Sequence, residues 1–180
     1  NKKVLGEADT RPILEAYGMS LVPGGVAYDA KNAVEIAEEI GFPVAVKVVS
    51  DQVLHKSDLG GIALNLNSND SLQKAINEIE DRIKDAEPAA KIDGFLVEKM
   101  APKGLEVIVG MRRDPTFGPL MMFGLGGVYV ELFKDVGFGV APLSPEQARD
   151  MITATKAGKL LGGFRGGPMY DIDAVVDAIG

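Results

Sequence analysis

The sequence contains no cysteine and no tryptophan, and it has one histidine among its 180 residues. Without cysteine, a disulfide framework and a thiolate metal site are both excluded. Because His55 is the single histidine, a zinc site built from several histidines is excluded as well. The lack of cysteine is compatible with a reducing compartment, and we expect the protein to be cytoplasmic.

Long apolar runs and an excess of basic residues are also missing. No apolar run approaches the about 20 residues of a membrane-spanning helix, so we expect no membrane partner. The 19 Lys and Arg residues are outnumbered by 26 Asp and Glu residues, which gives a net charge of −7. Since nucleic-acid backbones attract clustered basic residues, we expect no nucleic-acid partner. A small nucleotide remains compatible, because it needs only a few local cations and backbone amides.

Apolar periodicity and turn residues predict a mixed order of helices and strands. Helices are predicted at 9–17, 29–40, 70–86, from Ser144 onward and at 172–179. Strands are predicted at 44–50, 62–66, 93–100, 105–114, 137–143 and within 118–133, where the strand runs into a glycine turn. A turn at Ala101–Gly104 joins two of these strands, most simply as an antiparallel pair.

This order places helix-bearing units first and antiparallel strands second, which predicts an α+β (mixed α/β) fold of two lobes. A uniform βαβ array fits the order less well. We expect a lead-in helix over 1–19, an N-terminal lobe over 20–93 with a loop at 51–61, and a C-terminal lobe over 94–180.

Three charged residues on predicted strands are candidates for binding. Lys47 lies in the middle of an otherwise apolar strand, and a buried ammonium needs an anion or a water-filled cleft. It is interpreted either as part of an internal ion pair or as a ligand to phosphate. Glu98 and Glu106 lie on later strands, where a carboxylate can accept hydrogen bonds from ribose hydroxyls, orient a lysine, or simply face solvent.

Glycines suggest a second kind of site. The sequence around Gly124, Gly126 and Gly127 fails the dinucleotide pattern, because Tyr129 stands where a third glycine is required. These glycines still allow backbone amides to approach phosphate oxygens, although a tight turn explains them equally well. Arg165, between two pairs of glycines, is a candidate either for a phosphate or for a carboxylate partner.

Further charged residues follow these glycines. Glu131, Lys134 and Asp135 have the chemistry to approach a phosphate-bound Mg²⁺, or they form a solvated charge cluster.

His55 is followed by Lys56, Ser57 and Asp58. A neutral imidazole is nucleophilic near pH 7, and Asp58 has the chemistry to hold one ring nitrogen while Lys56 and Ser57 stabilise a transferring phosphoryl group. From these residues alone, a structural or surface histidine is favoured over a catalytic one. No Ser-His-Asp or Cys-His signature stands out.

Four segments of the chain, 13–23, 37–66, 92–144 and 160–172, resemble the ATP-grasp part of ADP-forming acetyl-CoA synthetases. The resemblance implies a fold of two lobes with a nucleotide between their antiparallel sheets. It also implies the reversible conversion of acyl-CoA, phosphate and ADP to free acid, CoA and ATP, with ATP or ADP and Mg²⁺ as cofactors.

The resemblance assigns roles to several of the candidate residues. His55 matches a second phosphohistidine on a mobile loop, and Gly60–Gly61 is expected as its hinge. Lys47 matches the lysine that binds the nucleotide phosphates. The segment of Glu98, Lys99 and Met100 matches the linker that contacts adenine, and Glu106 matches the ribose ligand. Glu131 matches an acidic position near the phosphates.

The family also implies a partner. A CoA-binding α subunit or fused domain would supply the small carboxylic acid, CoA and a first phosphohistidine. The family's acidic-x-Asn-Pro metal segment is missing, so we expect a C-terminal lobe truncated before it and a chain inactive without its partner. One alternative is a non-catalytic ATP-grasp regulatory module fused to a protein acetyltransferase. Another is a purely structural interaction domain.

Overall fold

The computed structural model describes residues 5–53, 56–127 and 135–180. The chain divides into two compact units, Asn1–Pro102 and Lys103–Gly180, each with its own sheet and core. Within the described ranges, no helix has the length and apolar character to cross a membrane.

The first unit is built on a four-stranded antiparallel sheet with the order β1-β4-β2-β3. Its strands are β1 (Gly24–Ala27), β2 (Val44–Val49), β3 (Ile62–Leu66) and β4 (Gly94–Lys99). Helix α2 (Ala30–Ile40) connects β1 to β2, and α3 (Asn69–Ala86) connects β3 to β4. In each connection one other strand lies between the two that the helix joins, which makes two split βαβ units.

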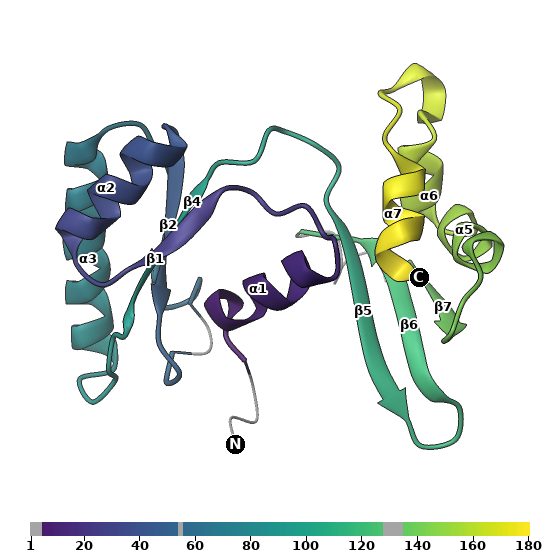
Figure 1. The fold of residues 1–180 in the computed structure, drawn as a ribbon, viewed down its shortest axis with the longest axis horizontal. Helices are drawn as coiled ribbons and strands as arrows, with labels where there is room; N and C mark the ends of the chain where they lie inside the picture. The colour runs from purple at the N-terminus through teal and green to yellow at the C-terminus, as the bar shows by residue number, and fades with distance from the viewer. Residues whose placement is uncertain (1–4, 54–55, 128–134) are drawn as a thin grey trace. The chain divides into compact units, whose positions relative to one another are not determined.

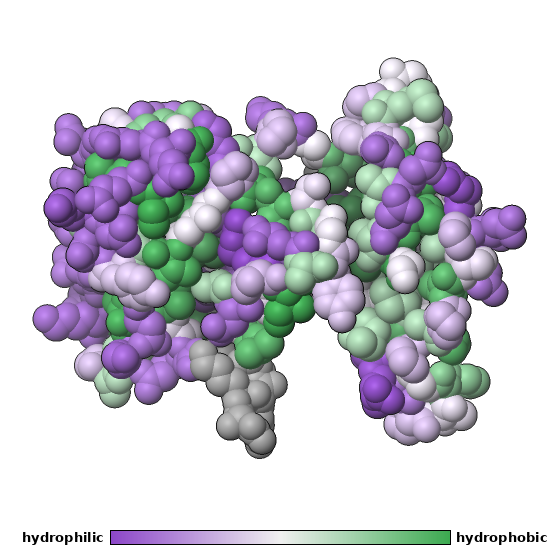
Figure 2. Space-filling model, viewed as in Figure 1, coloured by the Kyte–Doolittle hydropathy of each residue, from purple (hydrophilic) through white to green (hydrophobic). Residues whose placement is uncertain are grey.

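Helices α2 and α3 cover one face of this sheet (Figure 1). Side chains alternate along β2, so Val44, Val46 and Val48 point into the core under the helices. Asp29 and Ser68 cap the two helices by accepting a backbone N–H of the first turn. The solvent side of the two helices is hydrophilic (Figure 2), which is the pattern of helices packed on a sheet.

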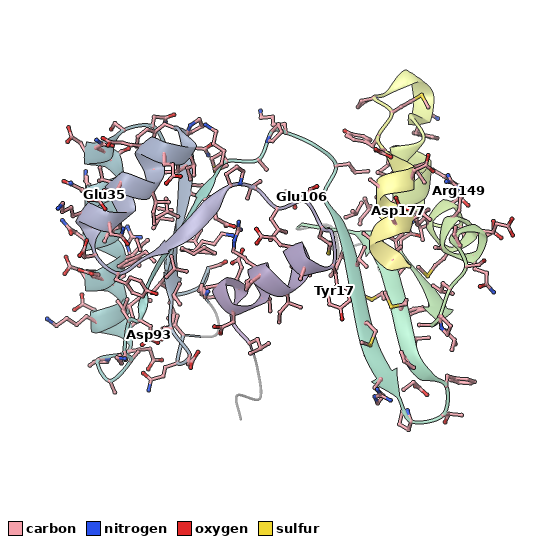
Figure 3. The ribbon with its side chains drawn as sticks, viewed as in Figure 1. Tyr17, Glu35, Asp93, Glu106, Arg149 and Asp177 are labelled. Carbon is pink, nitrogen blue, oxygen red and sulfur yellow. The ribbon has the colours of Figure 1, made fainter. Side chains whose placement is uncertain are left out.

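Helix α1 (Glu7–Ala16) approaches the other face of the same sheet, where Lys47 and Glu98 point. None of its residues is fully buried. Tyr17, at its C-terminal end (Figure 3), is 84% exposed. The attachment of α1 therefore depends more on polar contacts than on an apolar core.

The second unit is a three-stranded antiparallel meander, β5 (Val107–Asp114), β6 (Gly118–Leu125) and β7 (Val136–Val140). Helices α5 (Pro145–Thr153), α6 (Lys156–Leu161) and α7 (Ile172–Ile179) follow, with a 3₁₀ turn, η1 (Phe164–Gly166), between the last two. Phe123 and Leu125 of β6 pack with Ile152, Leu161 and Val176 in a separate core.

Among the described residues, the predicted helices and strands agree with the structure to within a few residues, with two corrections. The helix predicted from Ser144 onward is two helices, because Thr155 caps a new one, α6. Residues 128–133 of the strand predicted within 118–133 lie outside the described residues. One pairing is also wrong. The strands at 93–100 and 105–114 do not pair with each other. Instead, β4 lies between β1 and β2, and β5 pairs with β6. The reason is that β4 belongs to the first unit, where two neighbouring strands satisfy both of its edges, and the connection 100–106 leads out of that unit.

Candidate functional site

Lys47 is the centre of an ion-pair network on the face of the first sheet that α1 approaches. Its ammonium lies 2.6 Å from Oε1 of Glu7 and 2.7 Å from Oε2 of Glu98. The other oxygen of Glu98 accepts a short hydrogen bond from Nη1 of Arg11, whose Nη2 donates to the carbonyl of Val22 at 2.6 Å. Two cations and two anions therefore form one electrically balanced chain.

The sheet register explains why the Glu98 carboxylate fits here. Gly24 and Ala45 lie directly opposite Glu98 on the two neighbouring strands, so both cross-strand neighbours are small. A Cβ atom on Gly24 would lie 2.9 Å from Cγ of Glu98 and 2.7 Å from the Val97 carbonyl oxygen. Glycine at 24 therefore provides the space that the Glu98 side chain occupies.

The network keeps Lys47 charged. Burial by itself lowers the pKa of the ammonium, because it disfavours the charged form. Hydrogen bonds and charges from Glu7 and Glu98 outweigh burial, so the pKa of Lys47 lies above its ordinary value of 10.5. Of the two interpretations of Lys47, the internal ion pair is present in the structure. A protonated lysine held this way also has the charge that a phosphate group requires.

Glu7 and Arg11 are site residues that the sequence analysis missed. They lie four residues apart on α1, but the predicted helix began at residue 9 and left Glu7 outside it. Arg11 meets Glu98 across 87 positions of the chain, a separation that no local pattern reports. The available signal was the i, i+4 spacing of an acid and a base on a helix with little apolar surface.

A pocket of about 830 Å³ adjoins this network within the first unit. Glu7 and its neighbours at the start of α1 form one wall, and Val26 and Tyr28 form another. Four residues from the loop that follows β2 also line the pocket: Ser50, Asp51, Val53 and Lys56. The predicted catalytic residue Lys56 therefore lines the same pocket as Glu7, which forms an ion pair with Lys47.

The loop itself is described in part. Leu54 and His55 lie outside the described residues, so the structure carries no information on the predicted phosphohistidine. Residues 56–61 form a closed turn in which the Gly61 amide donates to the Lys56 carbonyl at 2.7 Å and the Gly60 amide to the Ser57 carbonyl at 3.2 Å. This is the hydrogen-bond pattern of a Schellman motif, and Gly60 supplies its left-handed residue with φ of +66°.

The same turn is tied to two neighbours. The Val48 amide of β2 donates to the Gly61 carbonyl at 2.8 Å, and Arg82 of α3 donates to the Gly60 carbonyl at 3.2 Å. Gly60–Gly61 is thus an anchored turn, which differs from the hinge expected at these residues. Asp58, exposed in this turn, lines a separate pocket with Arg82 and Asp85.

Lys99 and Met100 have other partners than the nucleotide predicted for them. The Lys99 ammonium donates to the carbonyls of Gly41 and Phe42 at 2.8 and 2.6 Å, where a positive charge suits the C-terminal end of α2. The Met100 amide donates to the Pro43 carbonyl at 3.0 Å. Both residues therefore fix the connection out of β4 in this structure, and their nucleotide contacts stay a prediction.

In the second unit, Glu106, Gly126 and Gly127 come together. The Gly126 amide donates to the Glu106 carbonyl at 2.8 Å, and a Cβ on Gly126 would lie 3.0 Å from the Val107 nitrogen. Gly127 has φ of +61°, and a Cβ there would collide with the carboxylate of Glu106. Figure 3 shows Glu106 just before β5. The turn thus needs glycines to let the exposed Glu106 side chain lie over it.

Arg165 lies apart from that group, in η1, with its guanidinium 5.3 Å from the centre of the Phe164 ring. Its backbone adopts a left-handed conformation with φ of +53°. Neither of the two partners predicted for it, phosphate or carboxylate, is tested by this geometry.

Glu131, the predicted metal ligand, lies in 128–134, outside the described residues. Across the ranges that the structure covers, no group of three or more acidic or histidine side chains is placed to hold a metal ion.

Comparison with known proteins decides the family. The model of the ATP-grasp domain matches residues 1–180. The chain belongs to the ATP-grasp family. This ATP-grasp chain is 50% identical, over 98% of its length, to acetate–CoA ligase (ADP-forming) I of Archaeoglobus fulgidus, of which it covers 26%. It is 43% identical, over 97% of its length, to the β subunit of acetate–CoA ligase (ADP-forming) I of Pyrococcus furiosus, of which it covers 75%.

Solved structures agree with the fold of the ATP-grasp chain. Acetyl-coenzyme A synthetase 1 of Ca. Korarchaeum cryptofilum, in complex with coenzyme A, Ca-AMPCP and HgCl⁺, matches with a TM-score of 0.90 and 49% identity, over 95% of this chain and 75% of that one. The same enzyme with coenzyme A and Mg-AMPPCP, its phosphohistidine segment pointing towards the nucleotide binding site, matches with a TM-score of 0.81 and 46% identity, over 97% and 75%. The two-lobed α+β fold expected from the sequence is confirmed.

Proposed function

We propose that the chain is the nucleotide-binding and phosphohistidine-relay part of an ADP-forming acyl-CoA synthetase. The whole reaction converts acyl-CoA, ADP and phosphate reversibly to free acid, CoA and ATP. The observation that carries the proposal is the charged Lys47 beside Glu98, on the strand that leads into the loop of His55. Support comes from the membership of the ATP-grasp family and from the similarity to β subunits of ADP-forming acetate–CoA ligases.

In the proposed relay, His55 carries a phosphoryl group and transfers it to ADP. A terminal oxygen of the ADP β-phosphate forms the new P–O bond, while the P–N bond breaks and the imidazole nitrogen leaves with the bonding electron pair. Lys47 neutralises charge on the nucleotide phosphates, and Lys56 stabilises the transferring group. Asp58 holds the imidazole, and Glu106 binds the ribose beside Gly126 and Gly127.

The remaining nucleotide contacts stay proposals of the same kind. Lys99 and Met100 would contact adenine, and Arg165 would reach a phosphate. Mg²⁺ would accompany ATP or ADP, with Glu131 as a ligand. Among the described residues, no three acidic or histidine side chains come together to hold a metal ion.

The acid and CoA are handled elsewhere in this proposal. The chain spans about a quarter of the full-length A. fulgidus relative and three quarters of the P. furiosus β subunit, so the acyl chemistry would belong to a CoA-binding α subunit or fused domain. We propose a cytoplasmic location, where ATP and CoA are both available.

The test is phosphorylation of His55. The chain, combined with a CoA-binding partner subunit, is incubated with Mg²⁺ and ATP labelled at the γ-phosphate. Acid-labile label is expected on the protein and is expected to disappear in His55→Asn. Full labelling of the His55→Asn protein would overturn the proposed relay. Nucleotide binding without any labelling would instead favour the non-catalytic regulatory module.

A further inference from the structure

Helix α1 contributes two residues to the network around Lys47, and they differ in burial. Arg11 and its partner Glu98 have only 13% and 6% of their side-chain surfaces exposed. Glu7 retains 42% exposure, although it lies 2.6 Å from the same lysine ammonium. The network therefore has a buried half and a solvent-facing half.

We propose that α1 is part of the nucleotide site, with Arg11 as a positioning residue for Glu98 and Lys47, and with Glu7 as a counter-ion that nucleotide phosphates displace from Lys47. The proposal rests on the proposed function, because it takes Lys47 as the phosphate ligand. It assigns roles to two residues of a helix that lies far from Lys47 in the sequence.

The buried half behaves as a fixed support. Arg11 uses both ends of its guanidinium, one on Glu98 and one on the Val22 carbonyl, so its position is set by two acceptors. Glu98 in turn holds Lys47 at 2.7 Å with its second oxygen. Removing Arg11 would leave a buried carboxylate balanced only by Lys47. Glu98 would then compete with a phosphate for that ammonium.

The exposed half behaves as an exchangeable one. Glu7 contacts Lys47 with a single oxygen and faces the pocket lined by Lys56. An ion pair with this much solvent access contributes little net stability, so an incoming phosphate with greater negative charge can replace it. Displacement of Glu7 leaves Lys47 bound to Glu98 and to the nucleotide, so the ammonium keeps two anionic partners.

The two roles predict opposite effects on nucleotide binding. The probe is ADP with Mg²⁺, titrated into the full chain by calorimetry. Glu7→Gln removes the competing carboxylate, so Kd is expected to fall about two- to five-fold. Arg11→Gln leaves the Glu98 carboxylate without its second cation, so it competes more strongly with phosphate for Lys47. Kd is therefore expected to rise about ten-fold. A purely structural role of α1 would raise Kd in both variants.

Two matched variants sharpen the comparison. Glu15→Gln removes an equal charge from an exposed position of the same helix and is expected to leave Kd unchanged. Arg11→Lys keeps the charge but loses the fork that reaches both acceptors, so its Kd is expected to lie between those of wild type and Arg11→Gln. If Arg11→Gln does not fold, Arg11→Lys takes its place, and a Kd equal to that of wild type then refutes the positioning role.

Failure of this inference is separable from failure of the proposed function. Lys47→Met is expected to weaken ADP binding strongly, and equal binding by wild type and Lys47→Met would overturn the role of Lys47 and, with it, both proposals. If Lys47→Met loses binding while Glu7→Gln behaves as Glu15→Gln does, only the role of Glu7 is refuted. An unchanged Kd in a folded Arg11→Gln refutes the positioning role. No measurable ADP binding by wild type overturns both proposals for this chain.

Discussion

At the scale of single residues, the site depends on small side chains as much as on charged ones. Gly24 and Ala45 flank Glu98 across the sheet, and the Glu98 carboxylate then lies between Arg11 and Lys47. Lys47 and Glu98 were candidates from the sequence alone, but the need for a small neighbour of Glu98 was not visible there. It follows from the register of β1 and β4, which brings Gly24 opposite Glu98.

Gly24→Ala should therefore disturb the site although it replaces no charged side chain. The added Cβ would lie 2.7 Å from the Val97 carbonyl oxygen, so the backbone or the Glu98 side chain must shift. We expect a loss of about 1–3 kcal/mol in the free energy of unfolding, together with weaker ADP binding. Chemical denaturation measures the first and calorimetry the second. Gly104→Ala is the control, since nothing lies within 4 Å of a Cβ there. Equal behaviour of the two variants would contradict the steric argument.

The raised pKa of Lys47 predicts a dependence of stability on alkaline pH. A group whose pKa is higher in the folded protein contributes stability that is complete below its unfolded pKa, near the ordinary 10.5, and that is lost as pH rises through the folded value. We expect the difference in unfolding free energy between wild type and Lys47→Met to be constant from pH 7 to pH 9 and to shrink above about pH 10.5. Urea denaturation across this range is the measurement, and a difference that grows with pH would have the wrong sign.

At the scale of elements, the turn 56–61 is the least expected feature. Paired glycines at 60–61 suggest freedom, yet both take part in a hydrogen-bonded turn that is joined to β2 and α3. The left-handed φ of Gly60 makes glycine necessary for closure of the turn rather than for motion.

Gly60→Ala tests the anchored turn. A side chain at φ of +66° is strained, and its Cβ would lie 2.9 Å from Cδ of Arg82. We expect the midpoint of thermal unfolding to fall, with a loss of about 1–2 kcal/mol in stability. Labelling of His55 by ATP should slow as well, because His55 directly precedes this turn in the sequence. Gly166→Ala is the control, because it introduces the same left-handed backbone strain without a steric contact of the new Cβ. Faster labelling in Gly60→Ala would favour a hinge.

At the scale of the whole molecule, the two units have independent cores. Ile79 of α3 is fully buried in the first, and Ile152 of α5 is fully buried in the second. Local signals made most helices and strands of both units predictable. Asp29, Ser68 and Ser144 are caps that mark where helices begin, and alternation marks the strands.

The parts of the molecule that were not predictable are those set by distant contacts. The pattern of β4 does not say that β1 and β2 are its neighbours, and nothing near Arg11 announces Glu98. The resemblance to a family supplied the roles of Lys47 and His55, which composition and spacing left open.

Separate cores predict separate responses to cavities. Ile79→Ala and Ile152→Ala should each destabilise their own unit by about 2–5 kcal/mol. Hydrogen exchange followed by mass spectrometry should show lost protection in the strands 44–49 and 94–99 for Ile79→Ala. Strand 118–125 should lose protection in Ile152→Ala. If either variant lowers protection equally in both units, the chain unfolds as one cooperative body.

The position of β4 has a consequence for the order in which the molecule is assembled. Among the strands that the structure describes, β1 pairs with β4 alone, and β4 is the last strand of that sheet to be synthesised. A chain growing from its N-terminus therefore carries an unpaired β1 until residue 99 is available, and this long-range pairing is a slow kind of folding step. Glu98 arrives on the same strand. Pairing of β4 therefore completes the sheet and brings the buried counter-charge to Lys47 at the same time. A nascent chain cannot form the Lys47 network in its final arrangement before the whole first unit has been synthesised.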